Sequence, residues 1–428
     1  PPIVPLPPTH PNPFVGRLRI ENGQFVDDTG SVLPVFCHAG DLLSLLLREP
    51  QRALRQMDLI AQAGFQGVRT WMQTGCGQNP CAPGDYWYGR VVGPTVTPEY
   101  WPLVDILIAE LRSRSLRLMW SQGDFPQLGS TMIQRCDYAR AVAHRYPGDD
   151  IAFFDAGNEM WHPSFRDWLY RAPENAAKFV RAYQNAGGRA LLTLSSPPGE
   201  GKAELDAYSL DPADCFDVHS YRGDHWYDKT RHVHGVVYQE DGPQPMRRLG
   251  VNSEGPGGSS HVPSRVSNIQ NSEELDDEAM GCLAAMSCIA QQAYVWFSGA
   301  GVINDAGLEN EPGFWTVPKL IAQLPRNLMR PGGTLHHCGR TWHDRGVAVF
   351  WLPDAPTLVR CNGVMHADGQ FAYVLDGPLG THRLRVDRAC DVTIIHPGTG
   401  EAHPFTLTAG QTWDVTWERG RVLLGRVR

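Results

Sequence analysis

Between residues 15 and 330, short apolar runs alternate with amphipathic stretches. Several runs are apolar at nearly every position, as in strands of a parallel sheet that helices cover on both faces. Eight such strand–helix units predict an α/β fold of the (β/α)8 TIM-barrel type. The predicted strands span 33–37, 67–72, 116–121, 151–154, 190–194, 216–221, 248–254 and 293–298, and the predicted helices span 50–63, 98–114, 131–145, 173–186, 229–240 and 273–291. A short hairpin over 23–30 precedes the first strand.

The composition changes near Thr334. Beyond it, stretches of alternating polarity such as 371–375 and 382–386 are separated by turn signals, which is typical of an antiparallel β-sandwich. With 428 residues, the chain is long enough for a barrel and one further domain. We expect an extended, proline-rich segment over 1–14, a catalytic barrel over 15–330 and a C-terminal β-sandwich domain over 331–428.

Two of the predicted strands end in a carboxylic acid. Asn158 and Glu159 follow the run that begins at Ile151, and Glu254 ends the run that begins at Arg248. An isolated Asn–Glu pair most often caps the next segment, but a second acid in the matching position favours a shared site. In a barrel of parallel strands, the carboxyl-terminal strand ends meet at one mouth, where the following loops carry the chemistry.

A pair of carboxyl groups facing each other at a barrel mouth is what glycoside hydrolysis requires. One group protonates the leaving oxygen, and the other, ionised, attacks the sugar or activates water. The interval between Glu159 and Glu254 holds three strand–helix units of about 32 residues, close to the roughly 31 expected when ~250 residues are shared by eight units. The two acids therefore fall at the ends of the fourth and seventh strands.

These residues resemble those of the clan of retaining glycoside hydrolases on (β/α)8 barrels that includes cellulases, mannanases and β-galactosidases. The similarity covers roughly residues 15–330. In that clan an Asn–Glu pair ends the fourth strand and a Glu ends the seventh. The resemblance implies that Glu159 is the acid/base and Glu254 the nucleophile of a double displacement, with Asn158 at the substrate. It also implies a β-glycosidic bond in an oligo- or polysaccharide as the target.

Other positions agree with the same clan. The clan has an Arg on the second strand, a His or aromatic residue on the sixth and a Trp on the eighth. The resemblance therefore implies contacts to the substrate or to the nucleophile from Arg69, from His219 and Tyr221, and from Trp296. The end of the third strand differs, because some cellulase-like families carry a His where this chain has Trp120, Ser121 and Gln122. The family within the clan, and with it the sugar, stays open.

The roles also make physical sense. Glu159 must begin protonated, and the negative charge of Glu254 would raise its pKa until that charge is lost in the glycosyl ester. Arg69 would keep Glu254 ionised through charge-assisted hydrogen bonds, unless it forms a purely structural ion pair. Tyr221 could donate to the same carboxylate. Asn158 suits the sugar 2-OH, where a hydrogen bond strengthens in the transition state.

Aromatic and histidine side chains supply candidate sugar contacts. Tyr86, Trp87 and Tyr88 lie in a long loop over 73–98, with Cys76 and Cys81 as a candidate disulfide at its base. The further candidates at the barrel mouth are His38, Trp71, Trp120, Trp161, His219 and Trp296. Mutual burial of these rings under the loops is the competing interpretation. Cys282 and Cys288, on one predicted helix, are interpreted as core residues.

The net charge and the motifs limit the classes of partner that the protein could bind. The net charge of −8 and the absence of a basic run argue against binding of nucleic acid or of an anionic membrane surface. There is no stretch of ~20 apolar residues, so no transmembrane span is predicted. No cofactor or metal motif is present, and we expect a monomer. The N-terminal stretch lacks the features of a signal peptide and resembles an extended tether or a trimmed mature terminus. We expect a secreted or periplasmic protein.

Two other classes of protein remain compatible with the sequence. One is a catalytically inactive barrel that only binds carbohydrate. The presence of both acids, together with Arg69 and Asn158, argues against this class. The other is a metal-dependent barrel hydrolase, for which candidate ligands exist but the usual His-x-His start does not. Those candidate ligands are His38, Asp41, His219 and Asp305.

Overall fold

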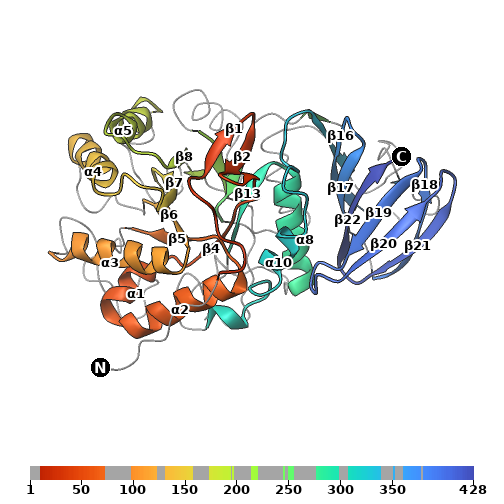
Figure 1. Ribbon diagram of the computed structural model, residues 1–428, viewed down its shortest axis with the longest axis horizontal. Helices are drawn as coiled ribbons and strands as arrows, with labels where there is room; N and C mark the ends of the chain where they lie inside the picture. Colours follow the sequence, from red (N-terminus) through yellow and green to blue (C-terminus); the bar gives the residue numbers. More distant parts are fainter. Residues whose placement is uncertain are drawn as a thin grey trace.

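The computed structural model of the chain describes residues 10–72, 98–122, 131–157, 173–193, 195–196, 214–219, 244–245, 249–254, 276–297, 307–338, 350–351, 360–376 and 379–428. They form a parallel barrel and, after it in the chain, two antiparallel sheets (Figure 1). The eight-stranded barrel predicted from the sequence is confirmed.

The barrel strands lie where the apolar runs predicted them. They are β4 (Val35–His38), β5 (Gly67–Trp71), β6 (Arg117–Ser121), β7 (Ile151–Asp155), β8 (Leu191–Thr193), β9 (Ser195–Ser196), β10 (Phe216–Val218), β12 (Gly250–Asn252) and β13 (Gln292–Trp296). Neighbouring strands pair in parallel, and β13 pairs with β4. β8 pairs with β7 while β9 pairs with β10, and one residue lies between β8 and β9. These two segments therefore occupy the fifth strand position together and close the ring.

Helices cover the outside of the barrel (Figure 1). They are α1 (Leu42–Arg48), α2 (Pro50–Ala63), α3 (Tyr100–Ser113), α4 (Met132–Arg145), α5 (Pro173–Asn185), α8 (Asp277–Ile289) and α10 (Val317–Ile321). α2 has the predicted bounds because Pro50 sits at its first turn and Gly64, at φ 96°, ends it. Thr131 and Gln134 form a capping box at the start of α4. The predicted helix over 229–240 lies outside the described residues.

α1 was not predicted, because Leu42–Arg48 is apolar almost throughout and lacks a polar face. Within the described part of the chain, no helix has both the length and the apolar character needed to cross a membrane.

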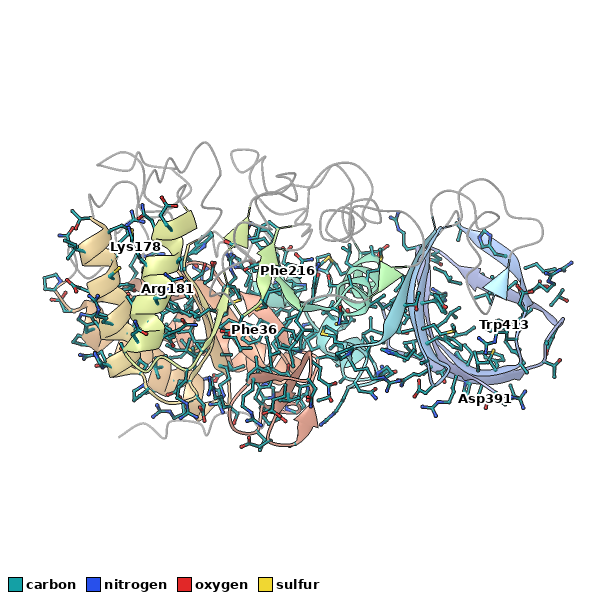
Figure 2. All side chains as sticks on the ribbon, turned by 90° about the horizontal axis from the view of Figure 1, so that it is seen from above. Phe36, Lys178, Arg181, Phe216, Asp391 and Trp413 are labelled. Atoms are coloured by element: carbon teal, nitrogen blue, oxygen red, sulfur yellow. The ribbon has the colours of Figure 1, made fainter. Side chains whose placement is uncertain are left out.

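The predicted hairpin lies against one end of the barrel. It comprises β1 (Arg19–Glu21), β2 (Gln24–Asp27) and β3 (Gly30–Ser31). Phe25 of β2 contacts the edge of Phe153 of β7 at 5.9 Å between ring centroids, and Phe153 contacts Phe36 of β4 at 5.4 Å. Figure 2 shows side chains filling the interior around Phe36. Since side chains alternate along a strand, His38 and Asp155, two residues further on, share the face of Phe36 and Phe153.

The C-terminal region consists of two antiparallel sheets. The larger sheet has the order β11 (Gln244–Pro245), β14 (Gly333–Cys338), β16 (Arg360–His366), β17 (Gln370–Asp376), β22 (Gly420–Val427), β19 (Cys390–Ile395) and β20 (Ala402–Leu407). The smaller sheet has the order β15 (Phe350–Trp351), β18 (Gly380–Val386) and β21 (Thr412–Trp417). Both sheets contribute to one apolar cluster that includes Tyr373, Leu423, Leu384 and Val415. β11 precedes residue 331 in the chain, so a barrel loop adds a strand to the larger sheet.

α8 joins the barrel to the larger sheet. Oε1 of Glu278 accepts hydrogen bonds from the backbone N–H groups of Arg419 at 3.1 Å and Gly420 at 3.0 Å, and from Nη1 of Arg421 at 2.6 Å. A Cβ atom on Gly281 would lie 2.4 Å from the carbonyl oxygen of Pro397, so only glycine permits this approach. Cys282 and Cys288, also on α8, are buried, as interpreted from the sequence.

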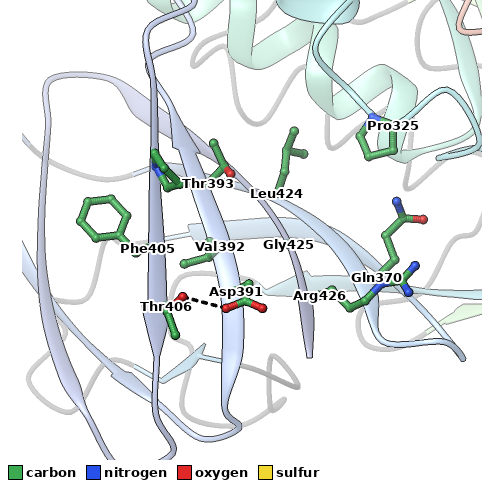
Figure 3. Close-up of a pocket in the computed structure, with 11 residues that line it drawn as sticks. Pro325, Gln370, Asp391, Val392, Thr393, Phe405, Thr406, Leu424, Gly425 and Arg426 are labelled. Carbon is green, nitrogen blue, oxygen red and sulfur yellow. Dashed lines mark hydrogen bonds between the residues drawn. The ribbon is translucent and has the colours of Figure 1, made fainter. Parts of the chain in front are cut away.

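A groove of about 620 Å³ lies on the larger C-terminal sheet (Figure 3). Its polar lining includes Asp391, whose Oδ1 accepts a 2.9 Å hydrogen bond from the hydroxyl of Thr406. The aromatic residue of the lining, Phe405, packs its ring against Trp413 of the smaller sheet at 5.1 Å. Trp413 itself packs against the core between the two sheets.

Candidate active site

Arg69 and Glu254 meet inside the barrel. Arg69 is the middle residue of β5 and is fully buried, and Glu254 stands two residues after β12 and is 5% exposed. Nη1 of Arg69 donates a 2.9 Å hydrogen bond to Oε1 of Glu254. A buried guanidinium needs paired negative charge, since an unpaired buried ion is strongly destabilising. The structure therefore joins the second and seventh barrel strands through the ion pair that the sequence predicted.

Two further carboxylates surround the same arginine. Oδ2 of Asp155 lies 3.7 Å from Nη2 of Arg69, and Asp217 contributes a third negative charge nearby. Burial alone would lower the pKa of Arg69, but the charges of Glu254, Asp155 and Asp217 raise it above its ordinary value. Arg69 is therefore a permanent cation at the centre of three acids.

Two histidines flank the pair. Nη1 of Arg69 lies 3.2 Å from Nδ1 of His38, so that Nδ1 must carry the lone pair if it accepts this hydrogen bond. Nδ1 of His219 lies 3.5 Å from Oε2 of Glu254, and its Nε2 lies 3.0 Å from the hydroxyl of Ser253. Each oxygen of the Glu254 carboxylate thus has a nitrogen of a basic residue beside it.

Asp155 is the last residue of β7, and its carboxylate accepts hydrogen bonds from a neighbouring side chain and from two backbone segments. Its Oδ2 accepts a 2.8 Å hydrogen bond from the Ser121 hydroxyl. Its Oδ1 accepts hydrogen bonds from the N–H groups of Gly157 and Ser195, both at 3.3 Å. The Ser195 hydroxyl in turn donates to the carbonyl oxygen of Gly157 at 2.9 Å. The first residues after the fourth strand are therefore fixed to the interior of the barrel.

Asp217 of β10 is held less completely. Its Oδ1 accepts from the N–H of Ser253 at 3.2 Å, while its Oδ2 is buried and has no hydrogen-bond partner among the described residues. Burial, followed by the charge of Asp155, raises the pKa of Asp217 to about 7, against the opposing effect of His219 and Arg69. Sequence reasoning missed both aspartates. The available signal was an acid inside each apolar run, in Phe-Phe-Asp155 and Phe-Asp217-Val.

The predicted site residues divide into three groups. Arg69, His38, His219 and Glu254 are brought together as described above. Two others, Trp120 and Trp296, lie away from this cluster. The remaining ones, namely Asn158, Glu159, Tyr221, Trp87 and Trp161, lie outside the described residues, as do Cys76, Cys81 and Asp305.

Trp120 and Trp296 point out of the barrel. Trp120 is fully buried and packs against Tyr138, Tyr146 and Phe154. Its neighbour Ser121 faces the interior, where it donates to Asp155, so alternation along β6 turns Trp120 outward.

Trp296 is likewise fully buried, against Phe65 and Phe314, and its Nε1–H donates to the carbonyl oxygen of Pro312 at 2.9 Å. The next residue, Phe297, contacts the ring of His38 at 4.8 Å. Both tryptophans therefore pack between strands and helices, and we do not carry them forward as sugar platforms.

Trp71 lies at the site instead. Its ring meets that of His38 edge-on, with 5.1 Å between centroids. Gly40 makes room for both, because a Cβ atom there would lie 2.7 Å from the Trp71 ring and 2.8 Å from Nε2 of His38. Trp71 is thus the tryptophan that the described structure brings to the cluster around Glu254.

The described residues include no group of three or more His, Cys, Asp or Glu side chains arranged to hold a metal ion. Asp41, one of the candidate ligands, instead lies 3.5 Å from Nη2 of Arg48.

Solved structures share this fold over nearly the whole chain. A glycoside hydrolase matches with a TM-score of 0.66 and 10% identity over 97% of each chain. A family 5 glycoside hydrolase from Bacteroides vulgatus matches at 0.63 with 11% identity, over 96% of this chain and 94% of the other. A family 27 β-L-arabinopyranosidase from Geobacillus stearothermophilus matches at 0.56 with 9% identity, over 92% and 96%. No protein-family model and no curated protein matches the sequence.

The chain therefore shares its fold, a parallel barrel followed by antiparallel sheets, with solved glycoside hydrolases. This confirms the resemblance at the level of the fold. At these identities the likeness extends to the fold alone, and the activity has to be argued from the site.

Proposed function

We propose that the protein is a retaining glycoside hydrolase that cleaves β-glycosidic bonds in an oligo- or polysaccharide, with Glu254 as nucleophile and Glu159 as acid/base. One observation carries the proposal: the carboxylate of Glu254 ends the seventh barrel strand in a 2.9 Å hydrogen bond to the buried Arg69. A carboxylate that is fixed and kept ionised in this way is suited to attack an anomeric carbon.

Support for the role of Glu159 comes from the described chain before it. Asp155 fixes Gly157 to the barrel interior, and Glu159 is two residues further along. The chain that leads to Glu159 therefore starts beside the Arg69–Glu254 pair. Retention requires the two carboxyl groups to lie ~5 to 5.5 Å apart, whereas inversion requires ~6.5 to 9.5 Å.

The reaction would proceed in two displacements. Glu159 donates its proton to the glycosidic oxygen while an oxygen of Glu254 bonds to the anomeric carbon, which releases the alcohol and leaves a glycosyl ester. Glu159, now a carboxylate, takes a proton from water as the water oxygen attacks the same carbon, and Glu254 leaves as a carboxylate. Asn158 would hold the sugar 2-OH, and Tyr221 would donate to Glu254.

The choice of substrate rests on the sequence and on the site together. The solved neighbours include a β-L-arabinopyranosidase and a family 5 enzyme, so the shared fold does not select one sugar. We infer a preference for longer β-linked chains because the loop over 73–98 carries Tyr86, Trp87 and Tyr88, which offer stacking surfaces beyond the reacting sugar.

A panel of aryl β-glycosides and β-linked polysaccharides, with product configuration followed by NMR, tests the proposal. We expect turnover with retention. Glu254→Ala should abolish turnover and regain it with inverted product when azide is supplied, whereas Glu159→Ala should spare only the first displacement, for aryl substrates whose leaving groups need no proton. Inverted product from the unmodified chain, or rescue by azide with inverted product in Glu159→Ala instead of Glu254→Ala, would contradict the assignment.

A further inference from the structure

Asp155 touches both halves of the proposed catalytic machinery. On one side, its Oδ1 accepts the N–H groups of Gly157 and Ser195 at 3.3 Å, which fixes the backbone that leads to Glu159. On the other side, its Oδ2 lies 3.7 Å from Nη2 of Arg69. The other nitrogen of that guanidinium fork, Nη1, donates to Glu254.

The surroundings make this arrangement rigid. The side chains of Asp155 and Arg69 are both fully buried. The Ser121 hydroxyl bridges them, because it donates to Oδ2 of Asp155 at 2.8 Å and accepts from Nη2 of Arg69 at 3.3 Å. Hydrogen bonds between buried groups hold those groups in a defined geometry. Ser195 adds a second tie through its hydroxyl to the Gly157 carbonyl.

We propose that Asp155 is a positioning residue that sets the separation of Glu159 and Glu254, by anchoring the chain before Glu159 and by orienting Arg69 on Glu254. The inference rests on the proposed function. Asp155 touches no reacting atom in this account; it acts through Gly157 and Arg69.

A purely structural role is the competing explanation. Asp155 would then only neutralise the buried charge of Arg69, and its loss would lower stability without changing the chemistry of correctly folded molecules. The two roles therefore differ in the kcat of the correctly folded molecules. Among the described residues, the titratable groups beside Arg69 and Glu254 are His38, Asp155, Asp217 and His219.

Asp155→Asn is the informative variant, because it keeps the shape and removes the charge. We expect kcat to fall about 10- to 100-fold with KM changed less than about threefold, since a displacement of ~1 Å can cost 10²-fold. Removing a neighbouring negative charge favours the ionised form of Glu254. The acid limb of the kcat/KM profile should therefore move to lower pH by about 0.5 to 1 unit.

Two matched control variants distinguish the effect of the Asp155 charge from that of the hydrogen bonds to Gly157. Ser195→Ala removes the hydroxyl tie to Gly157 and leaves every charge in place, so kcat should fall while the acid limb stays where it is. Asp217→Asn should also leave the acid limb in place, because burial raises the pKa of Asp217 to about 7 and its carboxyl is already protonated below pH ~5.

Amide exchange gives a readout that does not depend on activity. In Asp155→Ala, the amides of Gly157 and Ser195 should exchange faster than in the unmodified chain, because both lose their acceptor. If the unmodified chain hydrolyses no glycoside, the proposed function fails, and unchanged exchange at both amides would independently overturn the anchoring. If the unmodified chain is active, a normal kcat in Asp155→Asn overturns the positioning role.

Discussion

Arg69 and Glu254 are joined across the interior of the barrel by a 2.9 Å hydrogen bond, although two strands, β4 and β13, stand between β5 and β12 in the sheet. The pair therefore spans the barrel rather than linking neighbouring strands. Below it, Phe36 and Phe153 form an apolar layer with Phe25 of the hairpin. The charged residues thus lie directly above packed aromatic side chains. The barrel interior changes from apolar to polar toward the carboxyl ends of its strands.

The ion pair should set the pH at which the nucleophile becomes ionised. Arg69→Met removes the cation, so the pKa of Glu254 should rise and the acid limb of kcat/KM should move to higher pH by one unit or more, with at least a ~10²-fold loss of activity at neutral pH. Arg69→Lys keeps the charge but not the planar fork and should give a smaller displacement. Arg112→Ala, which removes an exposed partner of Asp150, is the control. An acid limb that stays in place in Arg69→Met would contradict the role given to Arg69.

Asp217 should make the fold less stable as the pH rises. Because its pKa in the folded state is about 7, above the ~3.9 of an unfolded aspartate, the folded state binds the proton more tightly. The stability gained from that proton is complete below pH ~4 and is lost as the pH rises through about 7.

The corresponding measurement compares chemical unfolding of the unmodified chain and Asp217→Asn at pH 5 and pH 8. Between pH 5 and pH 8, the free energy of unfolding of the variant should rise by on the order of 2 kcal/mol relative to that of the unmodified chain. A difference in free energy of unfolding that is the same at both pH values would show that Asp217 does not titrate in this interval.

Glu278 should hold the barrel and the larger C-terminal sheet together. Glu278→Ala removes the acceptor of two backbone N–H groups and of Arg421, all near the interface, and should lower the free energy of unfolding by about 3 kcal/mol. Calorimetry should also resolve two transitions if the two parts become uncoupled. Asp414→Ala is the matched control, because its ion pair with Arg383 lies on the surface and its loss should leave Tm unchanged. Equal effects of the two changes would argue against a role for Glu278 at the interface.

The apolar runs and the turn signals were enough to predict the barrel, because buried parallel strands have a recognisable composition. Glu254 was also predictable from its place at the end of an apolar run, and Arg69 from the resemblance to barrel glycoside hydrolases. Asp155 and Asp217 were not, since each is a single acid inside an otherwise apolar run and its partners come from distant strands. Side-chain direction was the other failure. A shift of one residue along a strand exchanges inside and outside, and Trp296 falls on the outer face.

The outward direction of Trp296 can be tested against that of Trp71. Trp296→Phe loses the hydrogen bond to the Pro312 carbonyl and leaves space between Phe65 and Phe314, which should lower the free energy of unfolding by about 1 to 3 kcal/mol. Because its ring faces away from Glu254, kcat/KM of the folded fraction should stay within about twofold. Trp71→Phe should show the reverse, with a smaller loss of stability and a several-fold lower kcat/KM, since its ring lies against His38 at the site. Thermal unfolding and steady-state kinetics on the same preparations separate the two effects. A large rise in KM for Trp296→Phe with unchanged Tm would indicate that the Trp296 ring contacts the sugar.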